Sequence, residues 1–342
     1  THRLDFGFIN IEHTKEAWFK QKLLDPRGFD HGKVKAPLEK LIMPNFNFIA
    51  CRRQCPRVIT VHDLSFLRYP HYFSHRHNFW QKSINIKKTL RQASRIIAVS
   101  NSTNKDIQEL CRISPKKIVT IYPGISAKYR PIDLNEPYAT EVKKKYQLPK
   151  KFILFLGTIE PRKNLEGIIE AYEQFRESQH AGLVHWEGQA EIRDETISLV
   201  IAGRPGWGYV SVYECARQSK YSRDIIFTDY IDDEDKIYLY NLAQFFIYPS
   251  FYEGFGFPPL EAAACGTPAI VSNVSSLPEI MSNAAILVDP FNIYEMAQAM
   301  AHLAYDKNLR AELSQAGLER AKQFNWEKCA REMIEVFETL KH

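Results

Sequence analysis

The chain has 342 residues, of which 45% are hydrophobic and 25% are charged, and its formal net charge is +5. This length allows about two domains, and the composition is ordinary for a soluble globular protein. No apolar run reaches the roughly 18–20 residues that span a bilayer, and no signal peptide opens the sequence. The small positive charge suits anionic ligands but is too weak to indicate nucleic-acid binding.

The six cysteines are scattered and form no C-x-x-C pair. They are Cys51, Cys55, Cys111, Cys215, Cys265 and Cys329. Most lie in apolar surroundings, which indicates reduced thiols in a cytoplasmic protein. The sequence begins at Thr1 without an initiator methionine, so we expect its natural beginning to be missing.

The first half of the sequence predicts alternating strands and helices. Strands are expected at 57–63, 95–100 and 117–124, and helices at 75–93 and 102–111. Residues 128–149 are rich in proline and charge, and we interpret their first part as a linker.

A second alternating series follows the linker. Strands are expected at 152–157, 197–202, 225–228, 245–248 and 268–272, and helices at 164–176 and 233–243. The stretch from 203 to Tyr221 is interpreted as irregular, and the run FPPLEAAACG predicts one more helix. Strands separated by helices form parallel sheets through right-handed crossovers. The sequence therefore predicts an α/β fold of two Rossmann-like domains, with ligands in the cleft beyond the carboxyl ends of the strands.

The run YEGFGFPPLEAAACG places Glu253 and Glu261 in different backbone environments. Its glycines allow close backbone approach, and its two prolines suit a first helical turn. We expect Glu261 in that turn and Glu253 in the loop before it, which argues against the opposed carboxylates of a glycosidase. Glu261 either accepts hydrogen bonds from a vicinal diol or stabilises the helix N-terminus by its charge.

The run GTIEPRKNLEGI carries Arg162 and Lys163 just after another expected strand, with Asn164 as the expected N-cap of the next helix. Cations at a helix N-terminus oppose the helix dipole, so this pair indicates an anionic ligand such as a diphosphate. The alternative is two solvated surface cations.

His62, in VHDLSF, is expected at the end of a strand and facing the same cleft. A purely structural histidine is the alternative, and Asp63 either orients its ring or caps the next turn. The acidic run YIDDEDK is interpreted as N-cap and first-turn acids of a helix. Because no His/Cys cluster has zinc spacing, we expect no metal site.

Several runs occur together in one order: VITVHDLSFLRYP, IIAVSNST, GTIEPRKN, GRPGWG, DYIDDEDKIYLY, EGFGFPPLE and LPEI. They resemble the family-4 retaining glycosyltransferases of GT-B fold, whose E-x7-E signature EGFGFPPLE matches. The resemblance covers about residues 38–340.

This resemblance implies a role for each matching residue. The implied catalytic residues are His62, Arg162, Lys163 and Glu253. The implied donor-binding residues are Gly157, Thr158, Tyr230, Ile231, Glu253, Phe255, Gly256, Phe257, Leu260 and Glu261. Glu261 would hold the ribose of a nucleotide-sugar, Glu253 the donor sugar, and Lys163 the diphosphate. Thr158 stands where the family has an arginine, which Arg162 would replace.

The resemblance also implies an activity and partners. We expect a retaining hexosyltransferase that uses a nucleotide-sugar, UDP-glucose ahead of GDP-mannose, without metal or cofactor. The acceptor would be a saccharide or lipid-linked saccharide in cell-surface polysaccharide synthesis. A non-catalytic nucleotide-sugar binder and a GT-B epimerase are the alternatives.

The implied domains are an acceptor-side unit at 1–130, with an incomplete first strand and loop, and a donor-side unit at 131–325. A C-terminal helix at 326–342 is expected to return to the first unit. The basic expected helix at 75–93 either contacts an anionic membrane, at the inner face of the plasma membrane, or is a solvated face.

Overall fold

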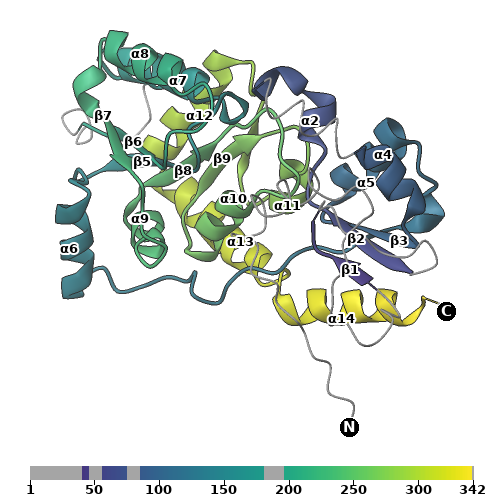
Figure 1. The fold of residues 1–342 in the computed structure, drawn as a ribbon. Helices are drawn as coiled ribbons and strands as arrows, with labels where there is room; N and C mark the ends of the chain where they lie inside the picture. The colour runs from purple at the N-terminus through teal and green to yellow at the C-terminus, as the bar shows by residue number, and fades with distance from the viewer. Residues whose placement is uncertain (1–40, 46–55, 75–84, 181–195, 341–342) are drawn as a thin grey trace, which may run out of the picture.

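A computed structural model describes residues 41–45, 56–74, 85–180 and 196–340. Two parallel sheets lie side by side, each with helices packed against it, and the chain crosses between them (Figure 1). We call the part around the first sheet the N-terminal domain and the part around the second sheet the C-terminal domain. The boundaries expected from the sequence stay a prediction.

The first sheet is parallel throughout, with strand order β1-β2-β3-β4. Its strands are β1 (Leu41–Met43), β2 (Arg57–Val61), β3 (Arg95–Ala98) and β4 (Ile118–Thr120). Its helices are α2 (Ser65–Arg68), α4 (Ile86–Gln92) and α5 (Asn101–Cys111), with 3₁₀ turns at Pro70–Tyr72 and Pro115–Lys117. Buried aliphatic side chains from both layers, such as Ile59, Leu90 and Ile107, form one core cluster.

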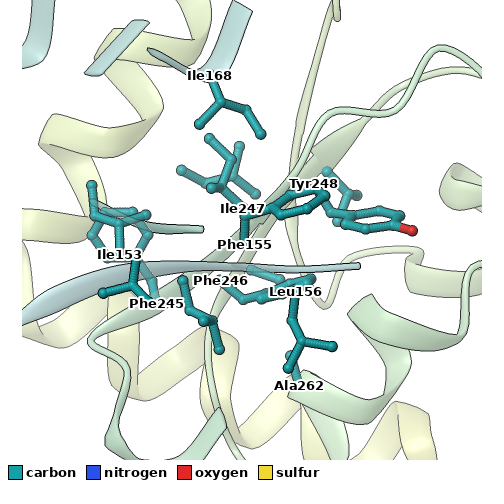
Figure 2. Close-up of a cluster of buried hydrophobic side chains, with 14 of the residues drawn as sticks. Ile153, Phe155, Leu156, Ile168, Phe245, Phe246, Ile247, Tyr248 and Ala262 are labelled. Carbon is teal, nitrogen blue, oxygen red and sulfur yellow. The ribbon is translucent and has the colours of Figure 1, made fainter. Parts of the chain in front are cut away.

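The second sheet is also parallel, with strand order β10-β9-β8-β5-β6-β7. Its strands are β5 (Phe152–Leu156), β6 (Ser198–Ala202), β7 (Ile225–Asp229), β8 (Phe245–Tyr248), β9 (Ala269–Ser272) and β10 (Ile286–Val288). The central strands are buried on both faces, and their side chains, among them Phe155 and Phe246, fill the core in Figure 2. Such strands appear in a sequence as unbroken apolar runs, which is why they were predictable.

Helices cover both faces of the second sheet. They are α6 (Pro137–Lys145), α7 (Leu165–His180), α8 (Val210–Gln218), α9 (Lys236–Leu242), α10 (Phe257–Ala264), α11 (Leu277–Met281), α12 (Ile293–Tyr305) and α13 (Lys307–Ala321). Two 3₁₀ turns occur at Pro161–Lys163 and Ser222–Asp224. In α7, Leu165, Ile168, Ile169, Tyr172 and Phe175 are all buried, as their helical spacing predicts.

The last helix, α14 (Trp326–Glu338), lies along the first sheet in Figure 1. Cys329 of α14 and Leu340 just beyond it share a buried cluster with Val58, Ile97 and Ile121 of the N-terminal domain. The chain therefore crosses the domain boundary a second time before this helix.

Several elements differ from the sequence-based expectation. Helix α8 occupies Val210–Gln218, where an irregular stretch was expected; its N-cap residue, Tyr209, provides no side-chain hydrogen bond, so the usual start signal is missing. Strands β1 and β10, of three residues each, were not predicted. Of the helix expected at 75–93, only Ile86–Gln92 lies within the described residues as a helix, and 75–84 lie outside them.

None of the helices in the described residues is long and apolar enough to cross a bilayer. The cysteines of the described segments (Cys111, Cys215, Cys265 and Cys329) are free thiols.

Candidate active site

A cavity of about 660 Å³ is lined by residues of both domains that follow the carboxyl ends of strands. It is lined by all but one of the residues expected at the site: His62, Gly157, Thr158, Arg162, Lys163, Tyr230, Ile231, Glu253, Phe255, Gly256, Phe257 and Glu261. The exception is Leu260, whose side chain is fully buried in the core of the C-terminal domain. Leu260 therefore packs α10 against the core of the C-terminal domain and does not line the cavity.

The loop from β8 to α10 enters the cavity with very little space around its backbone. A Cβ on Gly254 would lie 1.9 Å from the carbonyl oxygen of His62, so only glycine permits this approach between the domains. Gly256 has φ +101° and is the N-cap of α10. The Ser276 hydroxyl donates to the carbonyl oxygens of Glu253 and Phe255, at 3.0 and 2.8 Å, and fixes the loop from the other side.

Lys163 and Glu253 form a buried ion pair within this cavity. The Lys163 Nζ lies 2.5 Å from Glu253 Oε1 and also donates to the Tyr248 hydroxyl at 2.5 Å. Both residues are at most 8% exposed. In this structure the anion beside Lys163 is a glutamate from another loop, and the binding of a diphosphate by Lys163 stays a prediction.

Arg162 belongs to the same cluster. Its Nη1 donates to the Tyr252 carbonyl oxygen at 2.6 Å and lies 3.1 Å from Glu253 Oε1. Its Nη2 forms an ion pair with Glu160 at 2.6 Å. The interpretation of Arg162 and Lys163 as two solvated surface cations is therefore wrong.

The charges of this cluster determine the protonation of Glu253. Burial disfavours the charged carboxylate, but the attraction of Arg162 and Lys163 outweighs it and lowers the pKa of Glu253 to about 2. Burial also disfavours the charged ammonium group of Lys163 and so lowers its pKa, while the negative charge of Glu253 opposes that shift. Glu253 is consequently ionised at neutral pH and unsuited to act as a general acid.

Glu261 is the fifth residue of α10, so the expectation that it lies in the first turn is wrong. Both prolines occupy that turn, and the carboxylate comes one turn later, where the dipole of the helix is weak. Glu261 Oε2 accepts a hydrogen bond from the Tyr240 hydroxyl at 2.8 Å. Burial raises the pKa of Glu261, while hydrogen bonds from Tyr240 and Tyr129 oppose the rise.

His62 is exposed to the cavity just past β2. Its Nε2 lies 2.9 Å from the carbonyl oxygen of Pro44, and because a carbonyl only accepts, Nε2 carries the proton. Asp63 Oδ1 accepts from the Ser65 backbone N–H at 2.9 Å. Asp63 therefore caps the following turn.

Two expected N-cap residues lie where the sequence places them, but their side chains bind elsewhere. Asn164 directly precedes α7 and its carbonyl oxygen accepts from the Ile168 N–H at 3.1 Å, while its Nδ2 donates to the Pro290 carbonyl oxygen at 2.6 Å. Asp235 of YIDDEDK is the N-cap residue of α9 without a side-chain capping bond, and no acid lies in the first turn, so that part of the expectation is wrong. Asp232 and Asp235 accept from Lys145, at 2.7 and 2.6 Å, and Asp233 pairs with Lys128 and Lys236, so these acids attach α6 and the linker to the C-terminal domain.

Among the residues that the structure describes, no group of three or more His, Cys, Asp or Glu side chains is arranged to hold a metal ion. The positive charge at the cavity comes from the chain itself, through Arg162, Lys163, Arg204 and Lys236.

Comparisons with known proteins agree with this geometry. The sequence model of the family described as glycosyl transferases group 1 matches residues 139–320, and that of Glycosyltransferase Family 4 matches 42–129. O-antigen chain mannosyltransferase B of Escherichia coli is 33% identical over 296 residues, covering 86% of this chain and 73% of that protein. This chain belongs to the glycosyl transferases group 1 family.

A second relative of this glycosyltransferase is the serotype-specific mannosyltransferase WbdA of Escherichia coli. It is 30% identical over 286 residues, which are 83% of this chain but only 33% of WbdA. Sucrose-phosphate synthase from Thermosynechococcus elongatus has the same fold, with a TM-score of 0.69 at 21% identity, covering 90% of this chain and 74% of that one. The glycosyltransferase thus has the expected GT-B fold of two α/β domains with parallel sheets.

Sequence reasoning missed two cations of the glycosyltransferase's cavity. The Arg204 guanidinium lies 3.8 Å from the centroid of the Tyr230 ring, and both side chains line the cavity. Lys236, the first residue of α9, also lines it. Arg204 follows β6 at the carboxyl edge of the sheet, and the rule that ligands lie at that edge would have identified it.

Proposed function

We propose that this glycosyltransferase transfers a hexose from a nucleotide-sugar to a saccharide or lipid-linked saccharide, with retention of anomeric configuration, in cell-surface polysaccharide synthesis. The observation that carries the proposal is that Glu253, Glu261, Lys163 and the N-terminus of α10 line one cavity between two domains. A nucleoside diphosphate and a sugar together need a site of this kind, with hydroxyl acceptors at both ends and positive charge between them.

Each end of the cavity has suitable groups for one part of the donor. Glu261 accepts the ribose hydroxyls, and Tyr230 and the backbone of Ile231 meet the base. At the other end, Glu253 and the N–H groups of Phe255, Gly256 and Phe257 hold the hydroxyls of the sugar. Pro258 and Pro259 have no N–H group, so the donors at this end come from the loop and from the first residue of α10.

The diphosphate competes with Glu253 for Lys163. When the donor binds, the phosphate oxygens accept from Lys163 Nζ, and the Glu253 carboxylate is released to accept from a sugar hydroxyl. Arg162 remains bound to Glu160 and the Tyr252 carbonyl oxygen, and its positive charge attracts the nearby diphosphate. After this exchange, Lys163 and Glu253 both still have a hydrogen-bonding partner. A buried charge needs such a partner because it is costly to remove it from water.

The reaction follows from this arrangement. The bond between the anomeric carbon and the phosphate oxygen breaks, and the leaving diphosphate gains negative charge that Lys163 and Arg162 stabilise. The acceptor hydroxyl attacks from the same face, and its proton passes to the leaving phosphate oxygen. The enzyme therefore has to position the acceptor but does not need a basic side chain.

The names of the relatives favour mannose as the transferred sugar. Two relatives at 30–33% identity are mannosyltransferases, so we place GDP-mannose ahead of UDP-glucose, the reverse of the preference drawn from sequence. Thermal unfolding with each of GDP-mannose, UDP-glucose and an ADP-sugar tests this order. The preferred donor is expected to raise the melting temperature most.

The two glutamates provide the decisive experiment. Glu261→Gln is expected to weaken binding of the bare nucleoside diphosphate by about 1–3 kcal/mol, because it removes a charged acceptor for the ribose. Glu253→Gln is expected to bind the bare diphosphate at least as tightly as wild type, because no carboxylate then competes for Lys163, but to lose transfer from the full donor. Calorimetry and transfer assays on both variants measure these effects. Equal weakening of diphosphate binding by both would overturn the assignment, and donor binding without transfer or hydrolysis would support the alternative of a non-catalytic binder.

We also propose a peripheral contact with an anionic membrane, at the inner face of the plasma membrane, through the exposed cations of α4. Lys87, Lys88 and Arg91 are exposed on this helix. Each Lys or Arg near an anionic surface contributes about 1 kcal/mol. Sedimentation with vesicles of phosphatidylglycerol tests the contact, with neutral phosphatidylcholine vesicles as the control; equal binding to both would refute it.

A further inference from the structure

Helix α5 of the N-terminal domain carries a stripe of polar side chains that faces the C-terminal domain. Ser100, Thr103 and Asp106 recur every three residues, so they share one face of the helix. They are 0%, 0% and 3% exposed. Polar groups buried this fully need hydrogen-bond partners, and these partners lie in the loop between β8 and α10.

Two hydroxyl groups of the stripe converge on one carbonyl group. Ser100 Oγ donates to the Gly254 carbonyl oxygen at 2.6 Å, and Thr103 Oγ1 donates to the same oxygen at 3.1 Å. Two donors use both lone pairs of that oxygen, so its orientation is fixed.

Asp106, the third residue of the stripe, binds Tyr252, which directly precedes Glu253. The Tyr252 hydroxyl donates to Asp106 Oδ2 at 2.5 Å, and Arg68 holds Asp106 Oδ1 from within the N-terminal domain. Tyr252 and Gly254 are thus anchored to α5 on both sides of Glu253.

Fixing the Gly254 carbonyl group also fixes an N–H group. The Gly254 C=O and the Phe255 N–H belong to one planar trans peptide unit, in which they point in opposite directions. With the carbonyl oxygen turned toward α5, the N–H of Phe255 is turned away from it. Phe255 lines the cavity, and its N–H is one of the groups proposed to bind the donor sugar.

We propose that Ser100 and Thr103 are positioning residues, which align the sugar-binding loop from the opposite domain, with Tyr252 and Asp106 as the second attachment. This inference rests on the proposed role of that loop in holding the donor sugar. Docking of the N-terminal domain then completes the sugar subsite. The bare nucleoside diphosphate, bound by the C-terminal domain, does not depend on this contact.

The matched pair Thr103→Val and Thr103→Ser tests the proposal. Valine keeps the shape of threonine but removes the hydroxyl, whereas serine keeps the hydroxyl. Thr103→Val is expected to lower kcat about 3- to 10-fold, the effect of one lost hydrogen bond, with an unchanged Kd for the bare diphosphate. Thr103→Ser is expected to retain the wild-type kcat.

Two further variants complete the design. Tyr252→Phe removes the other attachment and is expected to give the same selective loss of kcat, also if Thr103→Val folds poorly. Ser102→Ala, on the same turn of α5 but outside the stripe, is the control and is expected to behave as wild type.

Each outcome decides the question. Wild-type kcat in both Thr103→Val and Tyr252→Phe overturns the positioning role while leaving the proposed transfer activity intact. Equal losses in Thr103→Val and Thr103→Ser mean that any change at this position impairs turnover and that keeping the hydroxyl does not restore it, which also overturns the positioning role. If wild-type protein neither transfers nor hydrolyses any donor, the proposed function fails, and the positioning role fails with it.

Discussion

At the scale of single residues, Lys163 shows what the sequence can and cannot predict. A cation next to a helix N-terminus is unfavourable, and this local fact indicated an anionic partner. Glu253, its partner in the structure, lies 90 residues away in sequence. Only the fold brings the two loops together, so the sequence predicted the chemistry of the position without predicting the pairing.

Replacing Lys163 by alanine is expected to lower kcat about 10- to 150-fold, because a charge-assisted hydrogen bond to the leaving diphosphate is worth about 1.5–3 kcal/mol. Transfer assays under saturating donor measure the effect. Lys322→Ala removes a cation whose side chain is 68% exposed and serves as the control. Wild-type turnover in Lys163→Ala would contradict a role for this ammonium in the reaction.

Glu253 is expected to make the protein sensitive to acid. Its pKa of about 2 in the folded state lies below the ordinary value of about 4.3, so the charged form stabilises the fold above pH 4.3. This stabilisation, about 3 kcal/mol, is lost as the pH falls toward 2. The difference in unfolding free energy between wild type and Glu253→Gln should therefore shrink from pH 6 to pH 3 in denaturant titrations. Glu319→Gln, which replaces a side chain that is 56% exposed, is the surface control.

At the scale of elements, the strands were more predictable than the short helices. Strands such as β5 and β6 are buried at every position, so each gives a continuous apolar run. Helix α8 buries only Val212 and Ala216, which leaves too few apolar positions for a clear helical pattern. Asp235 was correctly expected at the N-cap position of α9, but its bond to Lys145 of α6 was not, because Lys145 is distant in sequence.

Helix α6 is expected to depend on one carboxylate. Asp235 is fully buried and accepts from Tyr138, Lys145 and Tyr146 at 2.6–2.8 Å. Asp235→Ala removes the shared acceptor of these three donors, of which Lys145 keeps its ion pair with Asp232, and should cost about 3 kcal/mol, or roughly 6–12 °C in melting temperature. Asp233→Ala is the control, because this aspartate is 64% exposed and its ion pairs should contribute no more than about 1 kcal/mol. Equal losses in the two variants would show that burial of Asp235 is unimportant.

At the scale of the whole molecule, we expect activity to be independent of added metal. The cations that line the cavity can stabilise the diphosphate without a metal ion. Transfer rates should be the same in EDTA and in Mg²⁺ or Mn²⁺, measured on protein first dialysed against chelator. Loss of turnover in EDTA that either metal restores would contradict this expectation.

The two domains are joined where the chain crosses between them twice. The first crossing follows β4, the second precedes α14, and the Ile125 N–H donates to the Phe324 carbonyl oxygen at 3.1 Å to join them. Tyr122 and Phe324 pack edge to face at the same place, with Phe255 of the sugar-binding loop beside both. A change in the angle between the domains must therefore move this junction, and the junction contacts the active-site loop.

Gly124 is the position where a small change should disturb this junction most. A Cβ there would lie 2.1 Å from the Trp326 nitrogen and 2.4 Å from the Asn325 carbonyl carbon, and neither backbone atom can move without displacing the second crossing. We expect Gly124→Ala to cost about 1–3 kcal/mol as overpacking, or roughly 2–12 °C in melting temperature. The milder comparison is Gly317→Ala, where the nearest atoms, all of Ala263 in α10, lie at 3.3–3.4 Å, so that α10 has to yield only slightly and α13 gains a better helix former. Because the junction contacts Phe255, Gly124→Ala should also lower transfer at temperatures where it is fully folded. If Gly124→Ala has the same melting temperature and transfer rate as Gly317→Ala, the two chain crossings are packed less tightly than the structure indicates. The angle between the domains is then determined by other contacts.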